Sequence, residues 1–184
     1  MRAGPRNTHD CAKILALLSL ALVWLADAAF FNPYTFDQRI EVLEPKELEG
    51  LVFQSAFAQF AAMPGLGHGL EAYVTIADPI YACEPITSPD VRDTILLVDR
   101  GHCEFYTKAM HGRDAKASAV LISNVADREL PVPTWGLDHN EGLIPIPTAI
   151  IMGSDGITLK KLLKKGVPVK LRLSGVYIET RSIF

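Results

Sequence analysis

The chain has 184 residues, of which 49% are hydrophobic and 21% are charged, and its formal net charge at pH 7 is −3. This length and composition fit one globular domain that can bury a sizeable core. The slightly acidic balance argues against a polyanion-binding surface, so we expect no nucleic-acid partner.

The first residues have the pattern of a secretory signal peptide. Basic residues precede the apolar run at residues 14–26, and small residues then form a cleavage site before Ala29. The apolar run is shorter than the roughly 20 residues that a bilayer crossing needs. We therefore expect a signal peptide at residues 1–28 and a single mature domain at residues 29–184. That domain would have no membrane span and would be secreted or held in an endomembrane lumen.

The cysteines allow two interpretations. Cys11 falls within the expected signal peptide, which leaves Cys83 and Cys103 as an even pair in an oxidising compartment, and this predicts a disulfide. Alternatively, Cys103 is a reactive thiol, since it begins a predicted helix beside Arg100 and His102, and cations and helix N-termini lower thiol pKa values. The spacing matches neither a C-x-x-C redox motif nor a zinc site.

The first part of the mature chain has weak patterns. Residues 29–49 contain a short predicted strand, "RIEVLE", before a proline. Residues 51–69 then run from an apolar segment into a loop rich in proline and glycine. Phe53, Phe57 and Phe60 stand at helical spacing, but the segment is short, so the pattern leaves its conformation open.

Clearer elements follow in the middle of the chain. Residues 71–77 are rich in β-branched and aromatic side chains and predict a strand. Residues 94–99 and 119–123 are near-continuous apolar runs, which are typical of strands covered on both faces. Residues 104–113 have the length of a helix. Its predicted buried side consists of Phe105, Ala109 and Gly112. Strand, helix and strand in succession predict a crossover unit with parallel strands.

A similar unit follows a proline-rich loop at residues 127–145. Residues 146–152 predict a strand, "GSDG" a turn, and "ITLKKLLKKG" a short amphipathic helix that Ser154 or Asp155 caps. The predicted apolar stripe of this helix is Ile157, Leu159, Leu162 and Leu163. Residues 167–175 alternate as a half-exposed closing strand. The whole chain predicts an α/β fold with a β-rich core and two main helices.

Catalytic and metal-binding motifs are weak. The chain contains neither G-x-S-x-G nor H-E-x-x-H. Residues 138–142 resemble the start of a calcium loop, but Ala149 stands where the bidentate glutamate would be. The lysines of the second helix interleave with leucines and predict a solvated face. They are Lys160, Lys161, Lys164 and Lys165. We therefore expect no catalytic residue, no metal and no cofactor.

One turn is harder to dismiss as purely structural. Asp99, Arg100 and Gly101 follow a predicted buried strand. Glycine permits a positive φ and leaves backbone amides uncovered, and arginine at the carboxyl end of a strand can offer its guanidinium to a carboxylate or carbonyl. Alternatively, Arg100 pairs with a nearby acid and only fastens the turn. The residues alone leave both interpretations open.

Two longer segments resemble the protease-associated domain. They are "ILLVDRGHCEFYTKAMHGRDAKASAVLISN" and "IPTAIIMGSDGITLKKLL". The positions that match the family pattern are Cys103, Phe105, Lys108, Asn124, Pro147 and Gly156. The upstream stretch "FQSAFAQFAAMPGLGHG" is similar to the opening of this domain in plant vacuolar sorting receptors, so the resemblance covers about residues 40–175. Two residues depart from the pattern, namely Ser55, where the receptors would have cysteine, and Lys116, where the family usually has glycine.

The resemblance implies a β-rich fold with an open barrel or sandwich-like sheets, as in small stand-alone secreted proteins of this family. It implies a non-catalytic module that binds a peptide or protein of the secretory pathway, for sorting of cargo or modulation of proteases. Arg100 and Gly101 would contact the ligand, with Trp135 and Asp138 on the opposite wall in the loop at residues 127–143. Trp135 could equally be buried core. Alternatively, the domain docks on a protease or receptor as an accessory subunit.

Overall fold

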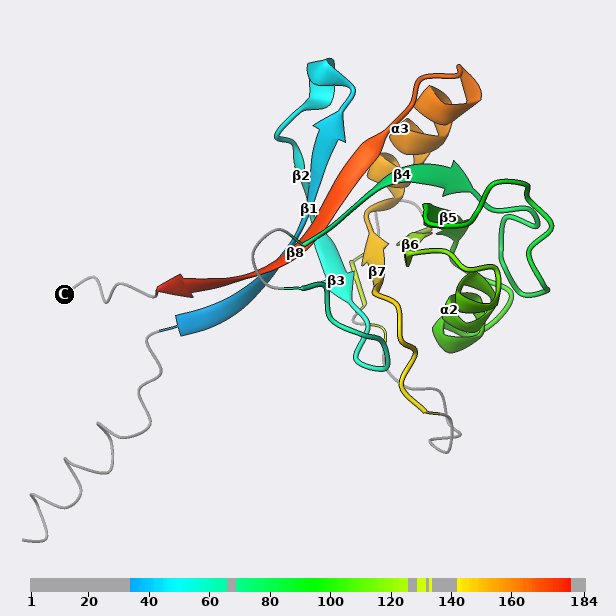
Figure 1. The fold of residues 1–184 in the computed structure, drawn as a ribbon, viewed down its shortest axis with the longest axis horizontal. Coiled ribbons are helices and arrows are strands. Elements are labelled where there is room, and N and C mark those ends of the chain that lie inside the picture. Colours follow the sequence, from blue (N-terminus) through cyan, green and yellow to red (C-terminus); the bar gives the residue numbers. More distant parts are fainter. Residues whose placement is uncertain (1–33, 66–68, 126–128, 132, 134–141, 180–184) are drawn as a thin grey trace, which may run out of the picture. The chain divides into compact units, whose positions relative to one another are not determined.

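The computed structural model describes residues 34–179 apart from residues 66–68, 126–128, 132 and 134–141 (Figure 1). The chain divides into two units: Phe36–Tyr177 forms one, and Met1–Thr35 with Ile178–Phe184 forms the other. Only the outer ends of the first and last strands belong to the described part of the second unit. The predicted signal peptide lies outside the described residues.

One mixed sheet of eight strands forms the body of the domain, in the order β2-β1-β8-β4-β5-β6-β7-β3. The strands are β1 (Tyr34–Glu44), β2 (Val52–Phe53), β3 (Ser55–Phe57), β4 (Leu70–Ile76), β5 (Ile95–Asp99), β6 (Ala119–Ser123), β7 (Thr148–Ile151) and β8 (Lys170–Glu179). Strands β4 to β7 run parallel, while β2, β3 and β8 pair antiparallel with β1, β7 and β4. The predicted α/β class and β-rich core are confirmed.

Two helices cover opposite faces of the parallel strands (Figure 1). Helix α2 (Phe105–Asp114) connects β5 to β6, and its face of the sheet presents Leu96 and Val120. Helix α3 (Gly153–Lys164) connects β7 to β8 and packs on the other face, where Leu97 and Leu121 lie. Because successive side chains of a strand point to opposite faces, the apolar runs of β5 and β6 are buried on both sides, as predicted. A short 3-10 helix, η1 (Lys46–Leu48), follows β1.

The segment whose conformation the sequence left open forms β2 and β3, at the two ends of the strand order. Phe53, Phe57 and Phe60 are all buried, but they enter the core from two strands and a loop rather than from one helix. The predicted strand "RIEVLE" is the second part of β1, which begins at Tyr34. The spacing of the phenylalanines therefore reflected burial without helical structure.

The start of α3 differs from the prediction. The "GSDG" segment is not a turn, because α3 begins at Gly153 and its N-cap is Met152, which makes no side-chain capping bond. The Gly156 amide donates to the Met152 carbonyl (3.1 Å), and a Cβ at Gly156 would lie 2.0 Å from the Ser123 hydroxyl. The glycine therefore lets the first turn of the helix lie against β6. The predicted caps, Ser154 and Asp155, were wrong.

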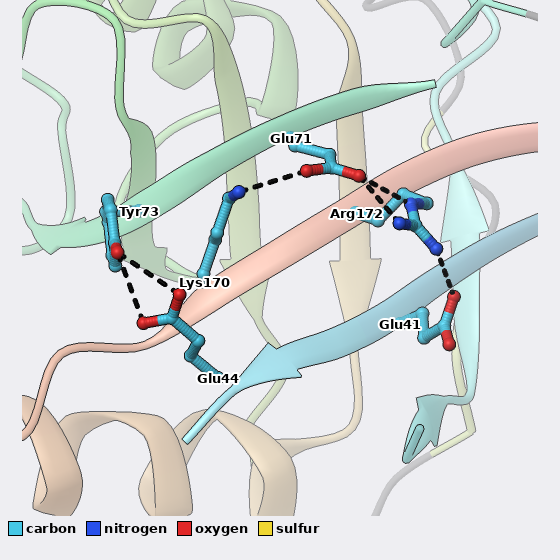
Figure 2. A network of polar contacts seen from close by, with 6 residues as sticks. All are labelled: Glu41, Glu44, Glu71, Tyr73, Lys170 and Arg172. Carbon is cyan, nitrogen blue, oxygen red and sulfur yellow. Dashed lines mark hydrogen bonds and ion pairs between the residues drawn. The ribbon is translucent and has the colours of Figure 1, made fainter. Parts of the chain in front are cut away.

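The exposed face of β1, β8 and β4 carries a network of charged and polar side chains (Figure 2). Glu71 accepts hydrogen bonds from Lys170 (3.0 Å) and Arg172 (2.7 Å), and Arg172 also donates to Glu41 (3.2 Å). The bonds from Arg172 and Lys170 hold the pKa of Glu71 below its usual range. Ion pairs in contact with water contribute little to stability. We therefore interpret this network as the solvated face of the sheet.

The turn after α2 contains Lys116, at the position where the family that the sequence resembles usually has glycine. Lys116 has a φ of +65°, and its amide donates to the Arg113 carbonyl (2.9 Å). Gly166 ends α3 in a similar way, with a φ of +76° and a bond to the Leu163 carbonyl (3.0 Å). The turn therefore has the left-handed backbone that glycine adopts without steric cost.

Replacing Lys116 by glycine is expected to raise the free energy of unfolding by about 1 kcal/mol, because a side chain in the left-handed region is strained. Urea denaturation of the wild type and the Lys116→Gly variant measures this difference. Lys165, at the end of α3 with a φ of −85°, is the control, and Lys165→Gly should give no gain. Equal effects of the two substitutions would show that the turn is not strained.

Candidate functional site

The Arg-Gly turn begins where β5 ends. The Arg100 amide donates to the Ser123 carbonyl of β6 (2.9 Å), which prolongs the pairing of the two strands by one bond. Gly101 and His102 then adopt φ values of +119° and +67°, and the Cys103 amide donates back to the Gly101 carbonyl (2.9 Å). This tight geometry turns the chain from the sheet into α2 within a few residues. Gly101 thus uses the positive φ that glycine permits.

A disulfide joins this turn to the loop that follows β4. Cys83 and Cys103 are bonded, with their Cα atoms 5.7 Å apart. The rings of Tyr81 and His102, which come from the two joined segments, are in contact, with 4.0 Å between their centroids and an angle of 53° between their planes. The predicted disulfide is confirmed in the structure, and the bonded Cys103 has no thiol that could act as a nucleophile.

A buried lysine on α2 holds both segments in place. Lys108 has no exposed surface, and its Nζ donates to the carbonyls of Tyr81 and Gly101, the latter at 2.8 Å. One turn further along the helix, His111 Nδ1 contacts the Ala82 carbonyl (2.9 Å). Burial lowers the pKa of Lys108 to about 8, against the opposing effect of the nearby Asp99 carboxylate. Helix α2 therefore positions the Arg-Gly turn through polar side chains as well as apolar packing.

Lys108 had no predicted role of its own beyond its match to the pattern of the family that the sequence resembles. A signal was present, because Lys108 stands three residues after Phe105 and four before Gly112, which places it on the predicted buried side of the helix. The structure buries Lys108 together with Ala109 and Gly112. A lysine within an otherwise small and apolar helix face therefore indicated buried acceptors for its amine.

The side chain of Arg100 is held from two sides. Its Nη1 donates to Asn124 Oδ1 (2.8 Å), and its guanidinium carbon lies 5.6 Å from the centre of the Phe105 ring. Asn124 in turn donates to the Glu129 carbonyl (3.3 Å), which ties the following loop to the same point. Among the described residues Arg100 pairs with no acid, so the group that holds its guanidinium in place is the side-chain amide of Asn124. A guanidinium has five N–H donors, and this bond uses one of them.

A pocket of about 620 Å³ opens beside Arg100. In the described part of the chain, its other lining residues are Glu129, Leu130 and Pro131, which belong to the loop predicted to form the opposite wall. The site thus combines a cation, an exposed acid and an apolar surface. The remaining predicted ligand residues, Trp135 and Asp138, lie outside the described residues.

The described residues offer neither a metal site nor a helix that could span a membrane. Within the described ranges, no group of three or more histidine, cysteine, aspartate or glutamate side chains could hold a metal ion. In the same part of the chain, no helix has the length and apolar character required to cross a membrane.

Comparison with known proteins gives matches in sequence and in structure. The family model for the PA domain matches residues 64–159. Vacuolar-sorting receptor 6 of Arabidopsis thaliana is 28% identical over 165 residues, covering 85% of this chain and 26% of the receptor. A PRADC1-like protein of Drosophila melanogaster is 28% identical over 140 residues, covering 70% of this chain and 67% of that protein. The chain thus spans about a quarter of the length of the sorting receptors that it matches.

Solved structures show the same fold. A zinc aminopeptidase from Bacillus subtilis matches with a TM-score of 0.56 and 23% identity, over 83% of this chain and 33% of the enzyme. An aminopeptidase from Aneurinibacillus sp. strain AM-1 has the same TM-score at 14% identity, over 78% of this chain and 34% of the enzyme. The family model, the sequence relatives and the fold agree with the resemblance found in the sequence, and the chain belongs to the PA domain family.

Proposed function

We propose that this chain is a non-catalytic module that binds a peptide segment of a protein through the turn formed by Arg100 and Gly101. The observation that carries the proposal is the position of the Arg100 guanidinium. Asn124 and Phe105 hold it at the border of the 620 Å³ pocket, while the bond to Asn124 uses one of its donors. Holding the side chain in advance lowers the entropy lost on binding.

The pocket has the chemistry for a short extended segment. Arg100 can donate to a carboxylate or to main-chain carbonyls, because its planar guanidinium suits bidentate bonds. Leu130 and Pro131 provide an apolar wall for a side chain of the ligand, and Glu129 can accept from a basic group or an amide. Together these features favour a peptide over a small uncharged ligand.

The secretory pathway is the compartment that we propose for this binding. The disulfide requires an oxidising environment, and relatives of the chain include proteins named as vacuolar-sorting receptors. The signal peptide stays a prediction from the sequence. Sorting of secretory cargo and modulation of a protease both fit a binding module in this compartment. The match covers 67% of the PRADC1-like protein, so only a third of that relative lies outside the matched region. This supports a role without catalysis.

The test is capture of secretory-pathway proteins by purified residues 29–184, followed by titration of the best-enriched partner. The Arg100→Ala variant is expected to bind that partner about 10- to 150-fold more weakly, which corresponds to the loss of roughly 1.5 to 3 kcal/mol from a charge-assisted hydrogen bond. Arg92→Ala is the matched control, since Arg92 is exposed and does not line the pocket. Arg100→Lys should recover only part of the affinity, because an ammonium cannot bind bidentately.

If Arg100→Ala and Arg92→Ala capture the same partner as strongly as the wild type, Arg100 only braces its turn. The chain would then act as an accessory subunit that docks through another surface. Circular dichroism and thermal unfolding of Arg100→Ala, measured beforehand, separate a local loss of binding from unfolding.

A further inference from the structure

A second pocket lies on the opposite face of the sheet from Arg100. It has a volume of about 460 Å³ and lies between α3 and the carboxyl ends of β4 and β5. Asp99 lines this pocket, whereas the next residue, Arg100, lines the first one. Consecutive residues of an extended chain point to opposite faces, so one end of β5 contributes to two separate surfaces.

The walls of this pocket combine aliphatic side chains and lysines. Ile76 and Ile80 contribute from the sheet side, and Ile157 contributes from the first turns of α3. The sequence placed Ile157 on the buried stripe of the helix, but its side chain is 47% exposed. Ile157 and Leu159 stand about 200° apart around the helix, so Leu159 points into the core and Ile157 lies at the pocket.

The lysines give the pocket an excess of positive charge. Lys160 donates to Asp99 (2.6 Å), and this ion pair compensates one cation. Lys161 and Lys164 also line the pocket and form no ion pair with any residue that the structure describes. Lys160 and Lys164 stand four residues apart, where like charges on a helix repel. Since the whole chain has a net charge of −3, this local excess is not a consequence of its composition.

Lysines near the carboxyl end of a helix are common, because they interact favourably with the helix dipole. The dipole does not account for an exposed isoleucine beside them or for the apolar wall opposite. A ligand with a carboxylate next to an aliphatic side chain would satisfy both features. The carboxylate would neutralise Lys161 and Lys164, and the side chain would cover Ile157.

We propose that this second pocket binds an acidic peptide segment in which an aspartate or glutamate lies beside a leucine, isoleucine or valine. The concave shape favours a protruding peptide over a membrane, because a flat anionic surface would meet the exposed lysines without filling the space between the isoleucines. The site is independent of the Arg-Gly turn, and a partner could occupy either face alone.

Nuclear magnetic resonance titration of the ¹⁵N-labelled domain provides the test, with a synthetic hexapeptide that alternates leucine and glutamate. We expect saturable shifts of the amide resonances of Ile80, Asp99 and α3, and much smaller shifts with a leucine and glutamine peptide. The double variant K161E/K164E should weaken binding about tenfold or more. The control K165E changes a neighbouring exposed lysine that does not line the pocket, so it should bind as the wild type does.

Three outcomes would overturn the proposal. The first is the absence of shifts at these residues with the leucine and glutamate peptide at about 1 mM. The second is an equal loss of affinity in K161E/K164E and K165E, which would indicate attraction by overall charge. The third is binding of α3 to vesicles that contain phosphatidylserine without binding of the peptide, which would identify the lysines as a membrane-contacting surface.

Discussion

The free energy of unfolding of the variant Lys108→Met is expected to be about 2 to 4 kcal/mol lower than that of the wild type. Methionine fills a similar volume, but it leaves the buried carbonyls of Tyr81 and Gly101 without the amine that now donates to both. A buried acceptor that loses its donor costs roughly 1 to 3 kcal/mol. The loss should be concentrated in the Arg-Gly turn and the loop before Cys83.

Chemical denaturation of Lys108→Met and of the wild type measures this effect, with Lys165→Met as the exposed control. The pH dependence provides a second readout. The pKa of Lys108 is about 8 in the folded protein, below its ordinary value of 10.5, so between these values the unfolded chain binds more protons. The contribution of Lys108 to the free energy of unfolding therefore rises as the pH increases from about 8 to 10. The difference in free energy of unfolding between the wild type and Lys108→Met should widen over the same range. A constant gap would contradict the buried-cation interpretation.

Removing the disulfide is expected to have an effect of similar size. The double variant Cys83→Ser/Cys103→Ser should lose about 3 kcal/mol of unfolding free energy, because the bond closes a loop with a sequence separation of 20. The bond also restrains two segments that contain positive φ values, at Ala82, Gly101 and His102. We therefore expect these segments to become mobile before the sheet unfolds.

Denaturant unfolding measures the loss, and hydrogen exchange of the amides near residues 81–83 and 100–103 measures its location. Reduction of the wild type should reproduce the behaviour of the double variant. If the double variant is as stable as the wild type, the contacts of Lys108 and His111 hold the two segments without the bond.

Elements with strong local signals were predictable from the sequence. The apolar runs of β5 and β6 could be assigned because strands buried on both faces have no polar alternation, and α2 lies within one residue of its predicted bounds. The cysteine pair was equally clear, since only two cysteines follow the expected signal peptide. The strands and the helix depend on short stretches of sequence, and the disulfide depends on the oxidising compartment that the expected signal peptide implies.

Features that depend on contacts between distant segments were predicted less well. Ser154 and Asp155 have good capping propensity, but the close approach of Gly156 to Ser123 places the helix start earlier. Ile157 was assigned to the same stripe as Leu159, although residues two apart stand about 200° apart around a helix, and it is exposed. The helical spacing placed Lys108 on the buried side of its helix, but its two carbonyl partners could not be predicted, because they come from separate loops.

The position of Arg100 shows the same limit. The sequence placed it at the carboxyl end of a strand, where ligands often bind. Its brace, Asn124, lies 24 residues further along the chain at the end of β6, and only the parallel pairing of β5 and β6 brings the two residues together. The structure shows an amide in place of the acid that one alternative expected, and contact of the guanidinium with a ligand stays a proposal.

The most direct measurement is a map of the captured partner's binding segment on the ¹⁵N-labelled domain. Our account predicts that the largest amide shifts lie at Arg100, Gly101, Glu129 and Leu130, and that they disappear in Arg100→Ala while persisting in Arg92→Ala. Saturable binding of the segment that leaves the resonances of these four residues unchanged would contradict the proposal that the Arg-Gly turn recognises peptides.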